Sequence, residues 1–273
     1  MHGALVVLAC LFLALRVQAA TDEQFERLLD LSGLTRQVQE LPNVLRAGFE
    51  QGAMQGSALP REVLDQIGGS VDEHIDPAVI LDEIRYAVLK RLNSEDISGL
   101  LQWYESDHGQ RIVAAEVAGS SAAAMNEMMT LSAELLAMEE RVAWAQRLDS
   151  LLQLTAMNYA IQSEVGTAVY RALLSAAEPE KEVDLAPFKE QMEAVEADLY
   201  DMMQQMVLVN ILYVYRDLDL PTLARYEAFL KEPVALMFNT AAAKGMQVGI
   251  VKVMDAWLMD VIRIAMESRQ SQE

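Results

Sequence analysis

Hydrophobic residues recur along this sequence at intervals of three and four positions, the spacing that places side chains on one face of an α-helix. One clear case is the segment 77–92, whose inner face consists of Leu81, Ile84, Val88 and Leu92. A second, near the end of the sequence, consists of Ile250, Met254, Trp257, Val261 and Ala265. No segment alternates with the period of two typical of a half-buried strand, and no Asn-Gly or Asp-Gly hairpin turn occurs. The pattern predicts an all-α fold.

Capping residues and helix breakers predict where these helices begin and end. Asn93 or Ser94 precedes a helix whose inner stripe is Ile97, Leu100, Leu101 and Tyr104. Asp219, with Pro221 just inside, begins another helix. Flexible breaks are predicted in the acidic segment 178–184 and around Gly52, Gly56, Pro60, Gly68 and Gly69.

Two segments of the chain return later in altered form. Residues 28–34 (LLDLSGL) correspond to 151–157 (LLQLTAM) with an offset of 123, and Leu92 to Tyr104 corresponds to Leu218 to Leu230 with an offset of 126. We interpret this as a duplication, with two tandem copies of a helical unit at 20–145 and 146–273. Breakers are rare between residues 120 and 176, so the junction near Ala145 is predicted to be helical. The two copies are therefore expected to pack together as one bundle-like body.

The first nineteen residues are typical of a Sec-type signal peptide. Ala4 to Leu15 is continuously apolar but too short to span a bilayer, and the small residues Val17 and Ala19 precede the expected cut. We therefore predict export to the periplasm, with no stable membrane span after signal cleavage. Cys10 is the single cysteine and would leave with the signal. The mature chain would then form no disulfide, bind no metal through thiolate and use no cysteine nucleophile.

The net charge of the chain limits the classes of molecule that it is expected to bind. The sequence has 21 basic against 41 acidic residues, a net charge of −20, and removal of Arg16 with the signal makes it −21. Such acidity argues against nucleic acid as a partner, because phosphate binding requires a basic patch. It also disfavours an anionic membrane surface. The simplest role of this charge is to keep the protein soluble.

The segment Leu100 to Arg111 (LLQWYESDHGQR) has a distinctive pattern. It resembles the motif of a bacterial exported family, domain of unknown function 2059, and a weaker second copy lies around Leu218 to Leu236. The resemblance implies a small helical domain exported across the inner membrane, and it implies no catalytic residue. Asp107 stands where the family usually has proline, and the second copy has Ala235 in place of the glycine.

The same motif also has a purely structural explanation as a corner between two helices. The hydroxyl of Ser106 is placed to cap the next helix, and Asp107 suits its first turn. Gly109 would let a neighbouring helix approach closely. The same corner contains Glu105-x-x-His108, a spacing found in di-iron proteins. His74 and His108 are the two histidines of the mature chain and Val71 stands where a second glutamate would be needed, which argues against a di-iron site.

Other metal and catalytic sites have weaker support in the sequence. A single zinc site would have to use His74 and His108 with carboxylates such as Asp72, Glu73 or Glu105, and it stays open as an alternative. The Gly-x-Ser-x-Gly turn of a serine hydrolase is absent.

Methionine is unusually frequent, with 16 residues. They group as Met125/Met128/Met129, Met202/Met203/Met206 and Met246/Met254/Met259/Met266. Methionine fills gaps in helical cores, but the same residues could line a plastic groove for a lipid tail, a peptide or a partner helix. Thioethers also bind Cu(I), although no histidine lies among these groups.

These observations favour a non-catalytic binding or interaction protein of the cell envelope, without a cofactor. The expected partner is an envelope protein, a small hydrophobic ligand or a second copy of the chain. The candidate binding residues are Trp103, Tyr104, Ser106, His108, Gly109, Phe229 and Trp257. The alternative is a metal-dependent enzyme or metal-binding protein that uses Glu105, His108 and nearby carboxylates.

Overall fold

A computed structural model describes residues 22–54, 61–177 and 183–270. Within these ranges the regular elements are α-helices and no β-strand occurs, so the predicted all-α fold is confirmed. The predicted signal peptide with Cys10 lies outside the described residues, as do Gly56, Pro60 and most of the acidic segment 178–184.

The helices follow one another closely along the chain. The first half contains the helical residues 22–31 and then α2 (Leu34–Met54), α3 (Arg61–Gly69), α4 (Val71–His74), α5 (Pro77–Leu89), α6 (Ser94–Tyr104), α7 (Asp107–Gly119) and α8 (Ala122–Leu136). The second half contains α9 (Glu139–Leu152), α10 (Leu154–Ala177), α11 (Ala186–Val214), α12 (Leu220–Leu230) and α13 (Pro233–Gln270). The predicted unit boundary beside Ala145 falls inside α9, so this junction is helical as expected.

Local sequence signals placed several helix ends correctly. The side chain of Asn93 accepts hydrogen bonds from the backbone N–H of Glu95 and Asp96, and Asp96 bonds back to the N–H of Asn93. Asp219 caps α12 by accepting a hydrogen bond from the N–H of Thr222 at 2.8 Å. Both caps satisfy N–H groups that have no partner inside the helix.

The predicted break at the glycines of the first half is wrong in part. Gly52 lies in α2, and Gly68 and Gly69 form the last positions of α3. Val63 and Ile67 of α3 are buried in the core. Burial of these side chains outweighs the cost of placing glycine in a helix, which is about 1 kcal/mol per residue relative to alanine.

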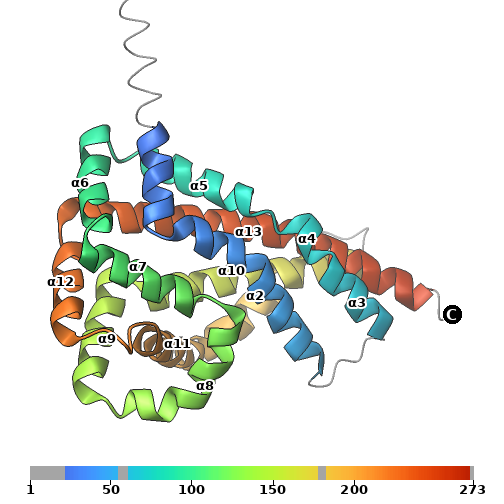
Figure 1. Cartoon of the computed structure of the whole chain (residues 1–273). Coiled ribbons are helices and arrows are strands. Elements are labelled where there is room, and N and C mark those ends of the chain that lie inside the picture. Colours follow the sequence, from blue (N-terminus) through green and yellow to red (C-terminus); the bar gives the residue numbers. More distant parts are fainter. Residues whose placement is uncertain (1–21, 55–60, 178–182, 271–273) are drawn as a thin grey trace, which may run out of the picture.

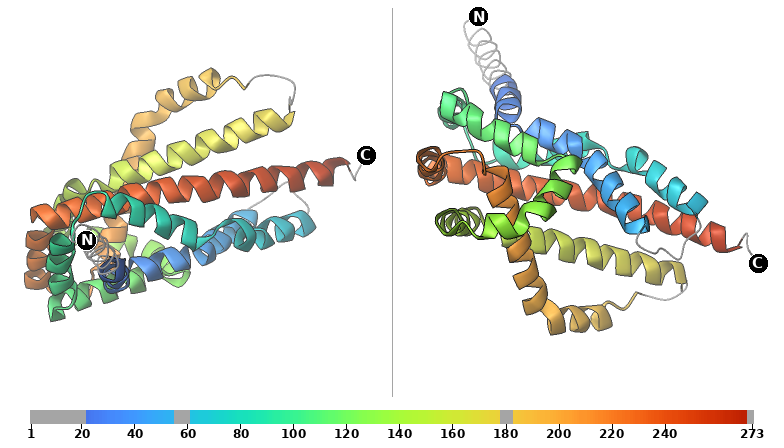
Figure 2. Two further views of the ribbon diagram at one scale, coloured as in Figure 1. Left: turned by 90° about the horizontal axis from the view of Figure 1, so that it is seen from above. Right: turned by 60° about the horizontal axis from the view of Figure 1, so that its bottom comes forward.

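Helices of each half pack against helices of the other. Figure 1 shows a body that is broad at the end with α6, α12 and α9 and tapers toward α3 and the end of α13. The long helix α13 lies between α5 of the first half and α10 of its own half (Figure 2). In the reverse direction, α11 of the second half packs on α7 and α8 of the first. Each half therefore covers the core of the other.

Small residues allow these helices to approach closely. A Cβ atom on Gly245 of α13 would lie 2.5 Å from Cα of Ile84 in α5, and one on Gly249 would lie 2.6 Å from Cα of Ile80. Gly119, at the end of α7, faces Val214 of α11 in the same manner, with a Cβ-to-Cγ2 distance of 2.6 Å. A side chain at any of these positions would push two helices apart.

Corresponding features of the two halves are separated by similar offsets of 120 to 126 residues. Helices α6 and α12 have equal lengths and begin 126 residues apart. The close-packing glycines Gly119 and Gly245 are separated by the same number of residues. Left-handed residues occur at the helix junctions Gly33 and Gln153, which are 120 residues apart. The helix ends thus pair Gly33 with Gln153, whereas the sequence pattern paired it with Ala156. The duplication itself stays a prediction.

Helix α13 also contains the most apolar long stretch of the described residues. By length and composition, Pro233–Ile264 is long and apolar enough to cross a membrane. In this structure a third of its most apolar window is buried within the protein. Within this structure α13 packs between α5 and α10.

Candidate functional site

A pocket of about 330 Å³ lies where the two halves meet at the broad end of the molecule. Its apolar lining comes from Leu34, Leu148, Leu152, Leu154, Met157, Ile211, Val214, Phe238, Ala242, Ala243 and Met246. Its polar lining includes Ser32, Gln37, Ser120, Asn210, Asn239 and Thr240. Asn210 and Thr240 are exposed, so the pocket opens on their side, while Ile211 and Phe238 are buried. Its size and mainly apolar wall are typical of small-molecule sites.

The one carboxylate among the residues that line the pocket belongs to Glu116 on α7. Its Oε1 accepts hydrogen bonds from the phenol hydroxyl of Tyr215 at 2.6 Å and from that of Tyr226 at 2.7 Å. A third tyrosine that lines the pocket, Tyr104, is buried nearby. No described residue donates a hydrogen bond to Oε2, and no described basic side chain forms an ion pair with Glu116. The carboxylate therefore has two neutral donors on one oxygen and no counter-charge.

This environment shifts the protonation of all four side chains. Burial raises the pKa of Glu116 above its ordinary value of 4.5, although the two phenol hydrogen bonds act in the opposite direction. Burial, and next the negative charge of Glu116, raise the pKa values of Tyr104, Tyr215 and Tyr226. The tyrosines therefore stay protonated as hydrogen-bond donors, while the ionised carboxylate is destabilised.

Two arginines of α9 hold the tyrosine-bearing elements in place. Arg141 donates to the backbone carbonyls of Tyr215 at 3.1 Å and Leu218 at 2.7 Å, and so caps the end of α11. Arg147 donates from Nε and Nη2 to the two carboxylate oxygens of Glu227, each at 3.2 Å. Glu227 adjoins Tyr226 on α12, so this pair fixes α12 against α9. The site is built on helices rather than loops, which favours a preformed pocket.

The binding residues that the sequence predicted lie in different parts of the molecule. Tyr104 lines the pocket, whereas Trp103 and Phe229 pack against each other behind it, with stacked rings 4.4 Å apart between centroids. Trp103 also stacks on Tyr226, 6.5 Å away between centroids. These aromatic rings fasten α6 to α12.

Ser106 and Gly109 have the structural roles that the corner explanation gives them. The N–H of Gly109 donates to Oγ of Ser106 at 3.1 Å, which caps α7. A Cβ atom on Gly109 would lie 2.2 Å from the carbonyl oxygen of Trp103, so a side chain there would force the corner open. Neither residue is part of the pocket lining.

The side chains of Glu105 and His108 contact different arginines. A carboxylate oxygen of Glu105 lies 2.7 Å from Nη2 of Arg27, while Nε2 of His108 contacts Nη1 of Arg225. Nδ1 of His108 is buried without a hydrogen-bond partner among the described residues. No group of three or more His, Cys, Asp or Glu in the described part of the chain is arranged to hold a metal ion.

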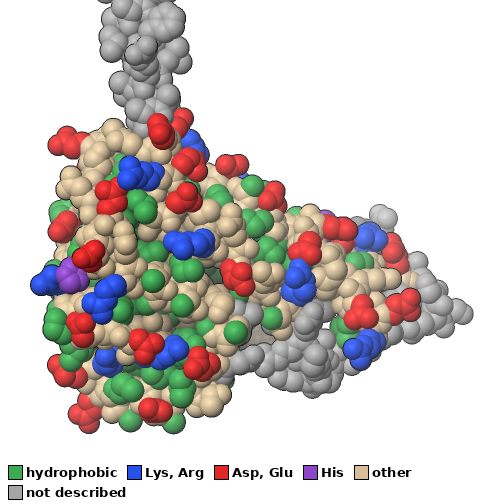
Figure 3. All heavy atoms as spheres, in the orientation of Figure 1, with side chains coloured by type: hydrophobic (Ala, Val, Ile, Leu, Met, Phe, Trp, Pro, Cys, Tyr) green, Lys and Arg blue, Asp and Glu red, His purple; other side chains and the backbone are tan. Residues whose placement is uncertain are grey.

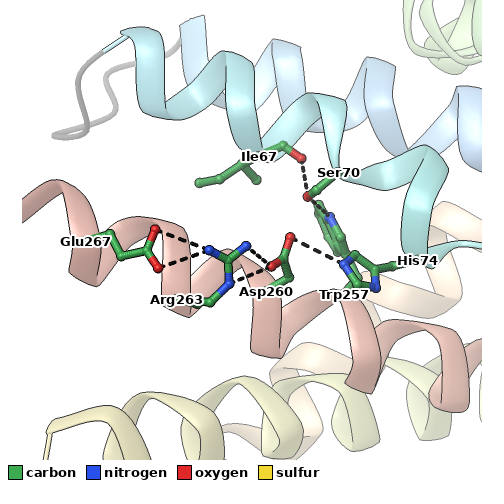
Figure 4. A network of polar contacts seen from close by, with 7 residues as sticks. All are labelled: Ile67, Ser70, His74, Trp257, Asp260, Arg263 and Glu267. Atoms are coloured by element: carbon green, nitrogen blue, oxygen red, sulfur yellow. Dashed lines mark hydrogen bonds and ion pairs between the residues drawn. The ribbon is translucent and has the colours of Figure 1, made fainter.

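Trp257 lies away from the other candidates, where α13 meets α3 and α4 (Figure 4). Its Nε1 donates to Oγ of Ser70 at 3.0 Å, and Ser70 donates in turn to the carbonyl of Ile67 at 2.9 Å. One turn further along α13, Asp260 lies 3.3 Å from Nε2 of His74 and also pairs with Arg263. These contacts fasten the tapering end and leave Trp257 outside the pocket.

The methionines divide between the interior and the surface. Met246 lines the pocket and Met254 is buried, and of the ungrouped methionines Met157 also lines the pocket. Others are exposed, namely Met125, Met129, Met202, Met206, Met259 and Met266. Charged side chains of both signs lie among hydrophobic ones on the face in Figure 3.

Sequence reasoning missed the residues at the centre of the pocket. Tyr215 and Tyr226 follow Glu116 in the sequence by 99 and 110 positions, so no local spacing connects either tyrosine with it. One signal was available, because Glu116 falls on the same helix face as the buried residues Ile112 and Val113. A glutamate on a buried face is a candidate for a paired or functional group.

Comparisons of the chain with protein-family models, curated proteins and solved structures found no match. The resemblance to domain of unknown function 2059 therefore stays a prediction, and the case for a function depends on the pocket.

Proposed function

We propose that this protein is a non-catalytic binding protein that holds a small, mainly apolar ligand in the pocket between its two halves. The observation that carries the proposal is the pocket itself, whose apolar wall surrounds the single carboxylate of Glu116 among the lining residues. The aromatic side chains of Tyr104 and Phe238 add apolar surface beside that carboxylate. This combination is typical of sites that bind by burial and orient the ligand through a few polar groups.

A binding role is favoured over catalysis because the pocket contains few groups that could carry out chemistry. Its lining has one carboxylate and three tyrosines whose pKa values are raised, and it contains no histidine, lysine or cysteine. An acid–base mechanism would need a second titratable partner near neutral pH. As part of the same proposal, the protein works in the periplasm, as the amino-terminal segment predicts.

The proposal is tested with a neutral fluorescent hydrophobic probe, N-phenyl-1-naphthylamine. Ala242→Leu adds carbon atoms to the pocket wall and is expected to lower probe binding at least tenfold. Ala114→Leu, on the exposed side of α7, is the matched control and should leave binding unchanged. Ala243→Leu repeats the test at a less buried lining position if the first variant fails to fold. Equal probe binding by the native protein and a folded pocket variant would contradict the proposal.

The metal-binding alternative is tested at the α6–α7 corner. His108→Ala is expected to change the free energy of unfolding by less than about 0.5 kcal/mol, because His108 is only half-buried and the substitution removes a buried Nδ1 that lacks a partner among the described residues. Zinc binding by the native protein that is lost in His108→Ala would support the alternative. Urea unfolding measures the change in the free energy of unfolding, and calorimetric titration with zinc measures the binding of zinc.

A further inference from the structure

We propose that the ligand of this pocket bears an ammonium group, which pairs with the carboxylate of Glu116 while its apolar body fills the remainder. The inference rests on the proposed binding function and names the chemical class of the ligand. Three observations carry it: the unmatched carboxylate, the aromatic rings around it and the charge of the whole chain.

The first observation is the incomplete coordination of Glu116. Both phenol donors, Tyr215 and Tyr226, use Oε1, and Oε2 receives no hydrogen bond from a described residue. A carboxylate has room for about four hydrogen bonds on its two oxygens. Glu116 is half-buried, so its carboxylate is partly removed from water, and the described residues supply no cation that pairs with it. An ammonium group of a ligand would provide both the missing donor and the missing charge.

The second observation is the aromatic surround. Tyr215 and Tyr226 bond to Glu116, and Tyr104 and Phe238 line the same pocket. The rings of Tyr215 and Tyr226 lie 5.9 Å apart between centroids, and those of Tyr104 and Phe238 lie 6.2 Å apart. The faces of aromatic rings attract organic cations, more strongly when water is excluded. An anionic ligand would instead meet an unscreened carboxylate.

The third observation favours a cation over a neutral molecule before binding begins. The chain has a net charge of −20, which raises the local concentration of cations around the protein. A metal ion fits this pocket poorly, because hard cations need six or more oxygen ligands and the lining contains a single carboxylate. An organic ammonium ion with an apolar tail satisfies both the carboxylate and the apolar wall.

The experiment compares two probes with the same tail, n-octylamine and 1-octanol, by isothermal titration calorimetry of the full chain at neutral pH. The native protein should bind octylammonium about tenfold more tightly than octanol, a difference of about 1.4 kcal/mol, because a hydrogen bond between charged groups is stronger than one to a neutral hydroxyl. Glu116→Gln preserves the size of the side chain and removes its charge, so this preference should disappear. Glu193→Gln, an exposed substitution on α11, should leave it intact.

The outcomes separate the inference from the proposed function. Equal binding of both probes, blocked by Ala242→Leu, would retain the binding function and overturn the ammonium inference. A preference that survives in Glu116→Gln would assign it to the overall charge of the chain and would also overturn the inference. Failure of both probes to bind would contradict the proposed function itself.

Discussion

The phenol oxygen of Tyr226 lies 2.7 Å from Oε1 of Glu116, and this hydrogen bond joins α12 of the second half to α7 of the first. Together with the bond from Tyr215, it holds the half-buried carboxylate of Glu116 at the boundary between the halves, where no basic side chain of the described residues forms an ion pair with it. Charges that are removed from water are usually paired, so we expect this unpaired carboxylate to affect the stability of the protein and its pH dependence.

Glu116→Gln should stabilise the protein at neutral pH and have no effect in acid. The pKa of Glu116 is raised above 4.5 by burial, so its contribution to stability is complete below that pH and is lost as the pH rises through the raised value. Glutamine stays neutral throughout and should therefore give a higher Tm at pH 8 and an equal Tm at pH 4.

Thermal unfolding followed by circular dichroism from pH 4 to pH 8 measures this difference. Glu193→Gln is the control, because Glu193 is exposed on α11. A Tm difference between Glu116→Gln and the native protein that is constant across this pH range would contradict the prediction.

Tyr226→Phe should destabilise the protein through the loss of its hydrogen bond to the carboxylate. At pH 8 the expected loss is about 2 kcal/mol in the native background and about 1 kcal/mol when Glu116 is already glutamine, because hydrogen bonds to charged groups are stronger. Tyr86→Phe, at a tyrosine that is 67% exposed, should have no measurable effect. Urea unfolding of the four proteins in the cycle gives the coupling energy, and additive losses would show that the two groups do not interact.

Two glycine substitutions should have opposite effects. Gly245→Ala places a methyl group 2.5 Å from the backbone of α5 and should cost about 2 kcal/mol, because backbone atoms cannot move aside cheaply. Gly99→Ala, on an open surface of α6, should stabilise by about 0.5–1 kcal/mol through helix propensity. Chemical denaturation measures both. A neutral Gly245→Ala variant would mean that α5 and α13 do not approach as closely as described.

Arg147→Ala should destabilise the protein at neutral pH by about 1 kcal/mol, a modest value because the arginine is half exposed. The hydrogen bonds from Arg147 lower the pKa of Glu227, and Lys231 adds to this effect. The corresponding stability is present above pH 4.5 and is lost as the pH falls through the lowered pKa. The difference from the native protein should therefore shrink in acid. Lys231→Ala serves as a comparison and should cost less, because its ion pair lies within one helix.

The sequence predicted the parts of this fold that depend on neighbours along the chain. The cap at Asn93, the start of α12 after Asp219 and the corner at Ser106 are all local, because each uses hydrogen bonds within three residues. The spacing Gly245-x-x-x-Gly249 is equally local and was open to recognition as a close helix contact, but its partner helix was not.

The candidate site depended on distant contacts and was predicted only through Tyr104. Glu116 has no distinguishing neighbours in the sequence, and its tyrosine partners come from elements around a hundred residues later. The conspicuous residues Trp103, Phe229 and Trp257 instead pack in the core or at the tapering end. Aromatic residues contribute large apolar areas to cores, which is the reason that their prominence in a sequence does not by itself identify a binding site.

Because each half packs against helices of the other, the order of synthesis affects how the chain can fold. Helix α5 (Pro77–Leu89) packs against α13 (Pro233–Gln270), so its inner face stays uncovered until a much later part of the chain has left the ribosome. Contacts between such distant segments slow folding and expose apolar surface to aggregation in the meantime. The core of the first half of this chain would therefore be complete only after synthesis had passed α13.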